Sequence, residues 1–315
     1  MPVPDLSVLF VSFNTAPLLG AALDALPAAA GGLSFEAIVV DNASSDGTPE
    51  RVRRQFPSAR LVESGGNLGF ARAMNLGLAI ARGRVLVWLN PDCVPAPGSL
   101  AALVAYLDAH PEVGAVGPCL RHPDGRVLPS AQRFPDVWHV VFHFLGVRRL
   151  ARNHHVRGLL RRSARAGTRA YLDALEPGGS PRDVDWVSGA CLATRADVAR
   201  TVGPLDEAYF MYCEDADWCH RVHEAGLRVR LVPAVEVVHH AGASGAANPG
   251  AVFHYYRSQL HYFKQHQPRQ FAIIRTLMFG GFVMRGVGNW LGRVAGRTGG
   301  HPWWRLAALC WTPAV

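Results

Sequence analysis

Residues 85–93 read Val85-Leu86-Val87-Trp88-Leu89-Asn90-Pro91-Asp92-Cys93. A short apolar run that ends in turn-forming residues indicates a strand buried on both faces. Pro91 cannot continue a hydrogen-bonded ladder, so Asn90 and Asp92 should follow the carboxyl end of that strand. Open α/β sheets bind ligands at that end, and two oxygen-bearing side chains there suit a divalent cation that holds a diphosphate. A plain turn is the alternative, because these residue types are common in turns.

Apolar runs and helical patterns alternate on both sides of this stretch. Strands are predicted at 6–13, 35–40, 60–63 and 113–116, and helices at 17–26, 70–81, 97–109 and in a segment that ends at residue 56. Further along, we expect a strand at 186–195, a helix from about 214 to 224, and a strand at 231–240 with a turn at Pro233. This alternation predicts an α/β fold with a mainly parallel sheet flanked by helices.

Several classes of protein and location are excluded or favoured by simple features. No stretch reaches eighteen uninterrupted apolar residues, so no membrane-spanning helix is predicted. Residues 1–5 lead directly into a strand without a signal peptide, which favours the cytoplasm. The six cysteines show no CxxC spacing and are predicted to be reduced and buried.

Two nucleotide-binding motifs are missing. The turn after the first strand, Ser12 to Thr15, has no glycine, unlike a dinucleotide-binding Rossmann unit. The only lysine is Lys264, which excludes a Walker A loop. We also expect no nucleic-acid partner.

The net charge of +8 is concentrated at the end of the chain. No acidic residue follows Glu236, whereas eight basic residues do: Arg257, Lys264, Arg269, Arg275, Arg285, Arg293, Arg297 and Arg305. With Trp290, Trp303, Trp304 and Trp311 nearby, this segment is predicted to lie on an anionic membrane surface. Packing on the domain or a homodimer contact are the alternatives. An arginine-rich stretch at 148–169 is either a solvated helix or loop, or an acceptor-side or membrane-surface element.

Two clusters of titratable residues lie in the second half of the chain. Glu214, Asp215 and Asp217 stand at the predicted start of a helix, with aromatic residues on both sides. Carboxylates are favourable there through the helix dipole alone, but a partly buried carboxylate is also a candidate general base. His239 and His240 end a strand, where a histidine pair is a candidate metal ligand.

Six motifs in this order resemble glycosyltransferase family 2, closest to its bacterial rhamnosyltransferase-like members. They occupy residues 39–48, 66–75, 89–92, 187–190, 214–217 and 239–244. The resemblance covers roughly residues 5–245 and implies a GT-A fold, a nucleotide-sugar donor and inversion at the sugar carbon. Each motif alone is weak, and the six in register are specific.

The resemblance also implies roles for individual residues. Asp41 would bind the nucleotide base, beside the turn with Ser12 and Asn14, and Asn67 and Asn75 would line the donor pocket. Asn90-Pro91-Asp92 stands at the family's DXD motif, so Asp92 would bind Mg²⁺ or Mn²⁺, with His239 preferred over His240 as the second ligand. Asn90 replaces the first aspartate, which leaves open whether it touches the metal or the sugar. Asp215 would be the general base, and the remaining residues would serve the acceptor side: Glu214, Trp186, Gly189, Ala190 and Asp217.

The sequence thus predicts a glycosyltransferase domain at 1–245 and a basic helical extension at 246–315. Within the domain, 1–118 would bind the nucleotide sugar, 119–183 would be a hairpin and basic insertion, and 184–245 would hold the acceptor and catalytic residues. The predicted reaction is metal-dependent transfer of a hexose, L-rhamnose from a dTDP donor, to a cell-envelope glycan or polyprenyl-linked acceptor at the inner face of the membrane. UDP- or GDP-sugar donors, a non-catalytic nucleotide-sugar-binding protein and a nucleotidyltransferase are the alternatives.

Overall fold

A computed structural model covers the chain and describes residues 2–144, 179–241, 250–294 and 303–312. The described residues belong to two compact units. The first is drawn from Met1–Phe134 and Ala170–Pro249, and the second from Pro135–Arg169 and Gly250–Val315. Residues 135–144 therefore group with the C-terminal helices, whereas the sequence placed them in an insertion of the first domain. The predicted arginine-rich stretch at 148–169 lies outside the described residues.

The first unit carries the sheets of the described chain. Its strands are β1 (Leu6–Ser12), β2 (Phe35–Asp41), β3 (Arg60–Glu63), β4 (Val85–Leu89), β5 (Cys93–Pro95), β6 (Val113–Arg121), β7 (Ala131–Gln132), β8 (Arg182–Asp183), β9 (Trp186–Val187), β10 (Cys191–Arg195) and β11 (Arg228–His239). Its helices are α1 (Ala16–Ala30), α2 (Thr48–Gln55), α3 (Phe70–Leu78), α4 (Ser99–Ala109), α9 (Ala196–Val202) and α10 (Glu214–Glu224).

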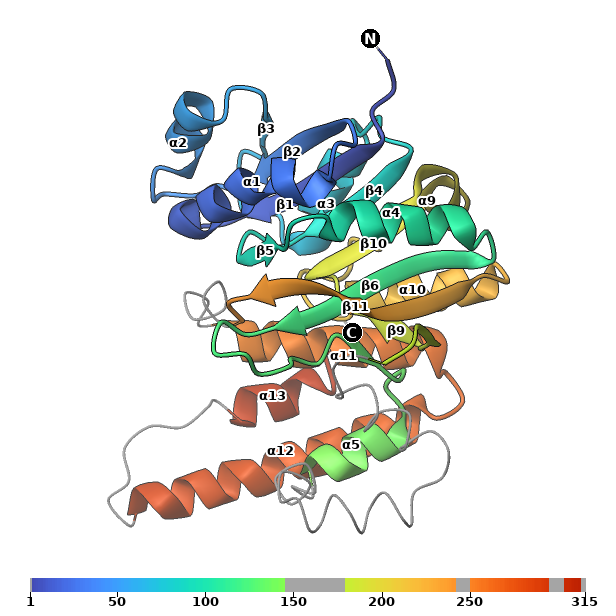
Figure 1. Cartoon of the computed structure of the whole chain (residues 1–315). Helices are drawn as coiled ribbons and strands as arrows, with labels where there is room; N and C mark the ends of the chain where they lie inside the picture. Colours follow the sequence, from blue (N-terminus) through green and yellow to red (C-terminus); the bar gives the residue numbers. More distant parts are fainter. Residues whose placement is uncertain (1, 145–178, 242–249, 295–302, 313–315) are drawn as a thin grey trace. The chain divides into compact units, whose positions relative to one another are not determined.

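The main sheet has the strand order β3-β2-β1-β4-β10-β6-β11-β5, with β8 paired to β11 (Figure 1). β1, β2, β3 and β4 pair in parallel. β10 is antiparallel to both β4 and β6, and β11 is parallel to β6. It follows that β3, β2, β1, β4, β6 and β11 all point the same way. The mainly parallel α/β sheet is confirmed, and the carboxyl ends of these strands share one edge.

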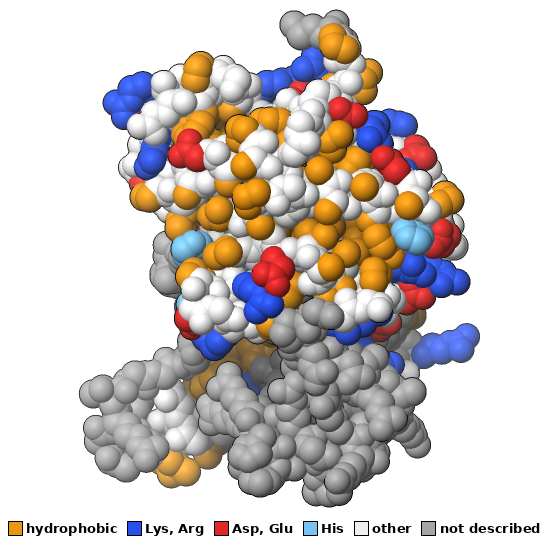
Figure 2. Space-filling model, viewed as in Figure 1, with side chains coloured by type: hydrophobic (Ala, Val, Ile, Leu, Met, Phe, Trp, Pro, Cys, Tyr) orange, Lys and Arg blue, Asp and Glu red, His pale blue; other side chains and the backbone are white. Residues whose placement is uncertain are grey.

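Helices cover both faces of this sheet because its strands are apolar on both faces. Alternate residues of β1 such as Val8 and Phe10 pack in one cluster with Leu19 of α1 and Leu103 of α4. On the opposite face, α3 approaches closely enough that a Cβ on Gly77 would contact the side chains of Leu9 and Val40. The side seen in Figure 2, over α1 and α4, shows apolar side chains in its middle and many charged ones toward its margin.

Some elements differ from the predicted ones. The expected strand at 186–195 is broken into β9 and β10, because residues 188–190 leave the ladder to form part of the site described below. The expected turn at Pro233 is an irregularity inside a continuous β11, whose register with β6 shifts between Val232 and Glu236. The three-residue β5 was not predicted, since so short a segment carries no periodicity.

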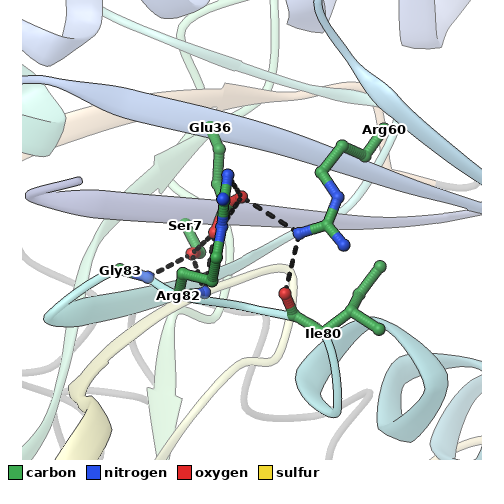
Figure 3. A network of polar contacts seen from close by, with 6 residues as sticks. All are labelled: Ser7, Glu36, Arg60, Ile80, Arg82 and Gly83. Atoms are coloured by element: carbon green, nitrogen blue, oxygen red, sulfur yellow. Dashed lines mark hydrogen bonds and ion pairs between the residues drawn. The ribbon is translucent and has the colours of Figure 1, made fainter. Parts of the chain in front are cut away.

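A buried carboxylate ties together the amino ends of the parallel strands (Figure 3). Glu36 of β2 accepts a hydrogen bond from Ser7 Oγ of β1 at 2.6 Å and from the Arg82 backbone at 2.7 Å. The guanidinium groups of Arg82 and Arg60 lie 3.1 and 3.2 Å from its Oε2. This network lies at the edge opposite the carboxyl ends, so it braces the sheet without occupying the ligand-binding edge.

The second unit is helical in its described part. It contains α5 (Val137–Phe144), α11 (Ala251–His266), α12 (Phe271–Val294) and α13 (Trp303–Leu309). Ile274, Met278 and Phe282 form a fully buried stripe on α12. Arg285 stacks 4.6 Å from the ring of Phe144.

Residues Phe271–Leu291 of α12 pass the length and composition test for a membrane-crossing helix, and no other helix in the described residues does. The criterion of an uninterrupted apolar run missed this segment because Arg275 and Arg285 interrupt it. The expectation of no membrane-spanning helix stays a prediction, because this test rests on length and composition only.

Candidate active site

The carboxyl edge of the sheet brings together segments from the whole first unit. Ser12, Asp41 and Asn90 stand at or just beyond the ends of β1, β2 and β4. Because β10 is antiparallel to β4, its beginning lies at the same edge, where Asn90 N–H donates to Ala190 O at 2.9 Å. β11 ends there with His239. Such an edge is where α/β sheets hold ligands.

Asp92 and His239 meet through the pairing of β5 with β11. Cys93 is the register partner of His239 in this antiparallel ladder. Asp92 Oδ1 and His239 Nε2 lie 3.4 Å apart. The His240 backbone N–H donates to Asp92 O at 2.9 Å, so His240 follows on the chain while the His239 ring faces the carboxylate. The structure therefore places the predicted pair of metal-ligand candidates together, and their role stays a prediction.

The donor set at this point fits a divalent cation. Asp92, His239 and Cys93 offer a carboxylate oxygen, an imidazole nitrogen and a sulfur that all lie within 4.8 Å of one another. Burial raises the pKa of the Cys93 thiol well above its usual value, and Asp92 and Cys191 raise it further. Sulfur ligands favour softer metal ions than Mg²⁺ or Mn²⁺, so Asp92 and His239 are the better candidates for these two ions. A carboxylate with an imidazole suits Mn²⁺ and admits Mg²⁺.

Asp41, the residue predicted to bind the nucleotide base, ends β2 and is 2% exposed. Its Oδ2 accepts a hydrogen bond from the Ser44 backbone at 3.0 Å. Its Oδ1 is buried and has no hydrogen-bond partner among the described residues. Since buried acceptors are normally satisfied, this atom is an open position for a donor on a ligand, such as a ring N–H of a pyrimidine base.

Two loops form the wall next to Asp41. Asn14 sits in the left-handed region at φ 54°. Its Oδ1 accepts from the Ser45 backbone at 2.7 Å, and its own N–H donates to Ser44 Oγ at 2.9 Å. Ser12 Oγ lies 2.8 Å from Thr15 Oγ1. The side chains of Ser12 and Asn14 therefore shape the loop, and a contact with the donor would come from the loop they hold.

Asn42 lies in the motif at residues 39–48, and the sequence predicted no role for it. It is 3% exposed. Its Oδ1 accepts from the Leu68 backbone at 2.9 Å, and its Nδ2 donates to Asn67 Oδ1 at 3.0 Å and to Gly69 O at 3.3 Å. Asn67 Oδ1 also accepts from the Gly69 backbone at 3.1 Å. Asn67 and Asn42 thus fix the glycine-rich loop after β3 beside the base pocket. A buried amide directly after Asp41 is the signal that could have found it.

Asn75 holds a backbone segment that is distant in sequence. Its amide donates to Leu205 O at 2.9 Å and accepts from Leu205 N–H at 3.0 Å. A third contact joins it to Glu207 at 3.2 Å. An asparagine amide has both a donor and an acceptor, so Asn75 can bond to the N–H and the C=O of Leu205 at once. These contacts hold the segment that precedes α10. The place of Asn75 in the donor pocket stays a prediction.

Asp215 lies in the first turn of α10 and faces the loop between β9 and β10. Its Oδ2 accepts from the Gly189 backbone at 2.9 Å, and its Oδ1 accepts from the Ala216 backbone at 2.9 Å. A Cβ on Gly189 would lie 3.3 Å from the Asp215 side chain. The structure therefore joins the predicted base to Gly189, and Ala190 to Asn90, at one edge.

Glu214 and Asp215 differ in their surroundings. Burial raises the pKa of Glu214 well above its usual range, and the charges of Asp215 and Asp217 add to the shift. Its Oε2 is buried without a hydrogen-bond partner among the described residues. Burial raises the pKa of Asp215 too, but the N–H groups of Gly189 and Ala216 oppose that shift. The pKa shift therefore favours Glu214 over Asp215 as the carboxyl group that keeps a proton.

Two predicted acceptor-side residues have structural partners. Asp217 is fully buried and pairs with Arg221 at 3.0 Å, one helical turn later. Trp186 donates from Nε1 to Arg133 O at 2.9 Å, and β9 pairs it with Gln132 of β7. Asp217 therefore braces α10, and Trp186 lies in the small β7–β9 sheet; acceptor contact stays a prediction for both.

With this fold and site, the chain belongs to glycosyltransferase family 2, as a rhamnosyltransferase-like member, and is a glycosyltransferase. The model of the glycosyl transferase family 2 domain matches residues 7–164. The chain is 36% identical over 226 residues to N-acetylglucosaminyl-diphospho-decaprenol L-rhamnosyltransferase of Mycobacterium tuberculosis, covering 68% of this chain and 69% of that protein. It is 27% identical to rhamnosyltransferase WbbL of Escherichia coli, over 56% of this chain and 63% of the relative.

Solved structures agree with the GT-A fold. The mannosyltransferase PcManGT of Pyrobaculum calidifontis, in complex with GDP-Man and Mn²⁺, aligns with a TM-score of 0.56 at 21% identity, over 98% of this chain and 79% of that one. GalNAc-T7 with UDP, GalNAc and Mn²⁺ aligns with a TM-score of 0.53 at 14% identity, over 83% and 48% of the two chains. At these identities the likeness shows the fold alone.

Proposed function

We propose that this enzyme transfers L-rhamnose from a dTDP-linked donor to a polyprenyl-diphosphate-linked sugar, with inversion at the transferred carbon. The observation that carries the proposal is that Asp41 and the Asp92–His239 pair lie at the carboxyl edge of the sheet, where Asp215 is bonded to Gly189 ahead of β10. The named rhamnosyltransferase relatives support the sugar and the acceptor.

The donor would bind along the ends of β1, β2 and β4. Asp41 Oδ1 would accept a ring N–H of the base, which thymine, uracil and guanine all offer, so the choice of dTDP rests on the rhamnosyltransferase relatives. The glycine-rich loop held by Asn42 and Asn67 would border the donor. Asn90 lies between Asp92 and Ala190, where it can reach either the diphosphate or the sugar.

Asp92 and His239 would hold Mg²⁺ or Mn²⁺. A bound divalent ion neutralises charge that develops on the leaving diphosphate. The two side chains are held rigid by the β5–β11 ladder, and Asp92 is almost fully buried, so the ligands are positioned before the donor arrives. Preorganised charges in such a site act more strongly than they do in water.

Asp215 would take the proton from the acceptor hydroxyl as that oxygen attacks. Inversion in one displacement requires a base on the face of the sugar opposite the leaving group. The Gly189 and Ala216 N–H groups orient the carboxylate, and neutral Glu214 beside it avoids a second charge. Glu214 is therefore suited to donate a hydrogen bond to the acceptor.

A lipid-linked acceptor would require peripheral binding at the inner face of the membrane, and α12 and α13 of the second unit support this. Ile273, Met284, Val287, Trp290 and Leu291 of α12 are exposed, on a side away from its buried stripe. Trp304 and Trp311 are exposed as well, at 54% and 53%. A helix with one face packed and one apolar face exposed suits a membrane surface, and the basic residues after Glu236 suit anionic lipid.

The test is a transfer assay with the full chain. dTDP-L-rhamnose and an N-acetylglucosaminyl-diphospho-polyprenol are incubated with Mn²⁺, Mg²⁺ or a chelator, and the product is analysed by mass spectrometry and NMR. We expect a metal-dependent product whose rhamnosyl linkage has the opposite anomeric configuration to the donor. Transfer from UDP- or GDP-sugars in place of dTDP-L-rhamnose would overturn the donor assignment, and full activity with the chelator would overturn the metal assignment.

A further inference from the structure

The segment that leads into the proposed catalytic carboxylates is bonded to α3, the helix that follows the glycine-rich loop. Residues 205–213 form this segment, which lies between α9 and Glu214 at the start of α10. The Asn75 amide pairs with both backbone groups of Leu205, at 2.9 and 3.0 Å, across 130 residues of sequence. At the other end of the segment, Phe70 N–H donates to Phe210 O at 2.6 Å. α3 thus grips the segment at two points.

Gly69 allows the second contact to form. Its φ is +81°, and a Cβ there would lie 2.4 Å from Phe210 O and 2.7 Å from Phe210 Cδ2. No other residue fits between the two backbones. The carbonyl of Gly69 accepts from Asn42 at 3.3 Å, so the residue that touches Phe210 is also fixed to the loop of the base pocket.

The backbone next to the carboxylates needs such support. Tyr212 and Cys213 both have φ in the left-handed region, at 72° and 66°, directly before Glu214. Consecutive non-glycine residues in this region are strained and persist only where the surroundings hold them. This double turn sets the direction in which α10 begins, and hence where Asp215 meets Gly189.

We propose that Gly69 and Asn75 are positioning residues that hold the 205–213 segment so that Asp215 faces the acceptor side of the donor site. The inference deepens the proposed function and rests on it for the role of Asp215. It assigns to Asn75 a task different from donor binding. Since α3 starts at the donor loop, the same helix serves both sides of the reaction centre.

The test compares Asn75→Ala and Asn75→Asp with Glu207→Ala in the full chain. Asn75→Ala removes both bonds to Leu205, and Asn75→Asp keeps the shape but turns the donor to Leu205 O into an acceptor. Glu207→Ala removes only the side-chain contact with Asn75 and the exposed pair with Arg72. We expect kcat to fall about 100-fold in both Asn75 variants, as for a misplaced catalytic group, with the Kd of the nucleotide sugar changed less than about twofold. Glu207→Ala should behave as wild type.

Amide hydrogen exchange provides a measure that needs no substrate. In both Asn75 variants, peptides from residues 205–215 should exchange faster than in wild type, while peptides from β1 and β4 stay protected. Unchanged exchange in this segment would overturn the positioning role, whatever the reaction. A weakened Kd with unchanged kcat would also overturn it, by returning Asn75 to donor binding. If wild type transfers no sugar while the exchange result holds, the proposed function fails and the structural clamp stands.

Discussion

At the scale of single residues, the neighbouring carboxylates Asp215 and Glu214 of α10 differ in their hydrogen bonds, and this difference shifts their protonation. Asp215 accepts two backbone N–H groups, whereas Glu214 keeps a buried oxygen without a partner among the described residues. Hydrogen bonds favour the ionised form of the first, and burial favours the neutral form of the second. Adjacent residues of the same chemical type can therefore serve as base and hydrogen-bond donor.

Asp215→Asn tests the base directly. The amide keeps the size of the side chain but cannot accept the acceptor proton, so we expect kcat to fall by about 10²- to 10⁴-fold. The Kd of the nucleotide sugar, measured by calorimetry, should stay the same. Asp24→Asn, at an exposed aspartate of α1, is the matched control and should keep full activity. A non-catalytic binding protein would show no rate to lose, and an unchanged rate would contradict the assignment.

The pH dependence follows from the raised pKa of Asp215. The base works only when ionised, so kcat/KM should fall as the pH drops through this pKa, at a higher pH than for an exposed aspartate near 3.9. The titratable and charged groups next to Asp215 include Glu214, Asp217 and Arg221, the partner of Asp217. Protons compete with a metal ion for its ligands, so an effect of pH on metal binding should move with the Mn²⁺ concentration.

The control therefore repeats the pH profile at two saturating Mn²⁺ concentrations. An acidic limb that stays in place belongs to the base. If instead the fall in kcat/KM moves to lower pH with more Mn²⁺, it reports protonation of the metal ligands. That result would contradict the assignment of the fall to Asp215.

At the scale of elements, the two edges of the parallel sheet have separate tasks. The carboxyl edge gathers the site residues, and the amino edge is braced by Glu36 with Ser7, Arg60 and Arg82 (Figure 3). Burial raises the pKa of Glu36, but the hydrogen bonds from Ser7, Arg82 and Arg60 outweigh it, so the pKa is lowered overall. The bracing therefore requires the ionised carboxylate.

Glu36→Gln should destabilise the fold by about 2 kcal/mol, since it leaves two arginines and a hydroxyl without their anion. The free energy of unfolding is measured by urea denaturation. Because the folded pKa of Glu36 is lowered, its contribution is present above the pKa of the unfolded chain and is lost as the pH falls through the folded value. The difference between wild type and Glu36→Gln should shrink accordingly.

Glu63→Gln is the matched control for this prediction. Glu63 pairs with Arg53 at the surface, where both side chains are about half exposed, and such pairs contribute about 0–1 kcal/mol. Equal losses in the two variants would contradict the bracing role of Glu36. Activity below the melting temperature should be unchanged in Glu36→Gln, because Glu36 lies at the amino edge of the sheet and not at the carboxyl edge.

At the scale of the whole molecule, the second unit carries the proposed membrane-binding face. We expect Met284→Glu combined with Val287→Glu to weaken binding to vesicles that contain phosphatidylglycerol, because two charges would enter the apolar face of α12. Co-sedimentation of the full chain measures the effect. Val3→Glu, at an exposed valine of the first unit, should bind like wild type. Unchanged binding of the double variant would favour a packing or dimer role for this face.

The sequence by itself determined the α/β class, the strand that ends at Asn90, and the membership in a glycosyltransferase family. These follow from local patterns: the apolar run of β4 is visible without its neighbours, and the motifs are short and contiguous. It also marked Asp92, Asp215 and His239, because carboxylates and histidines at element ends are conspicuous in a sequence.

Only the tertiary structure decided which of these residues meet. The pairing of β5 with β11 places the His239 ring next to Asp92. A hydrogen bond from the Gly189 N–H joins the loop between β9 and β10 to Asp215 of α10. The structure also showed that the Asn75 amide bonds to Leu205, a contact that the sequence did not predict. The reason is physical: β pairing and side-chain-to-backbone hydrogen bonds join residues far apart in the chain, and no local periodicity records which partners they find.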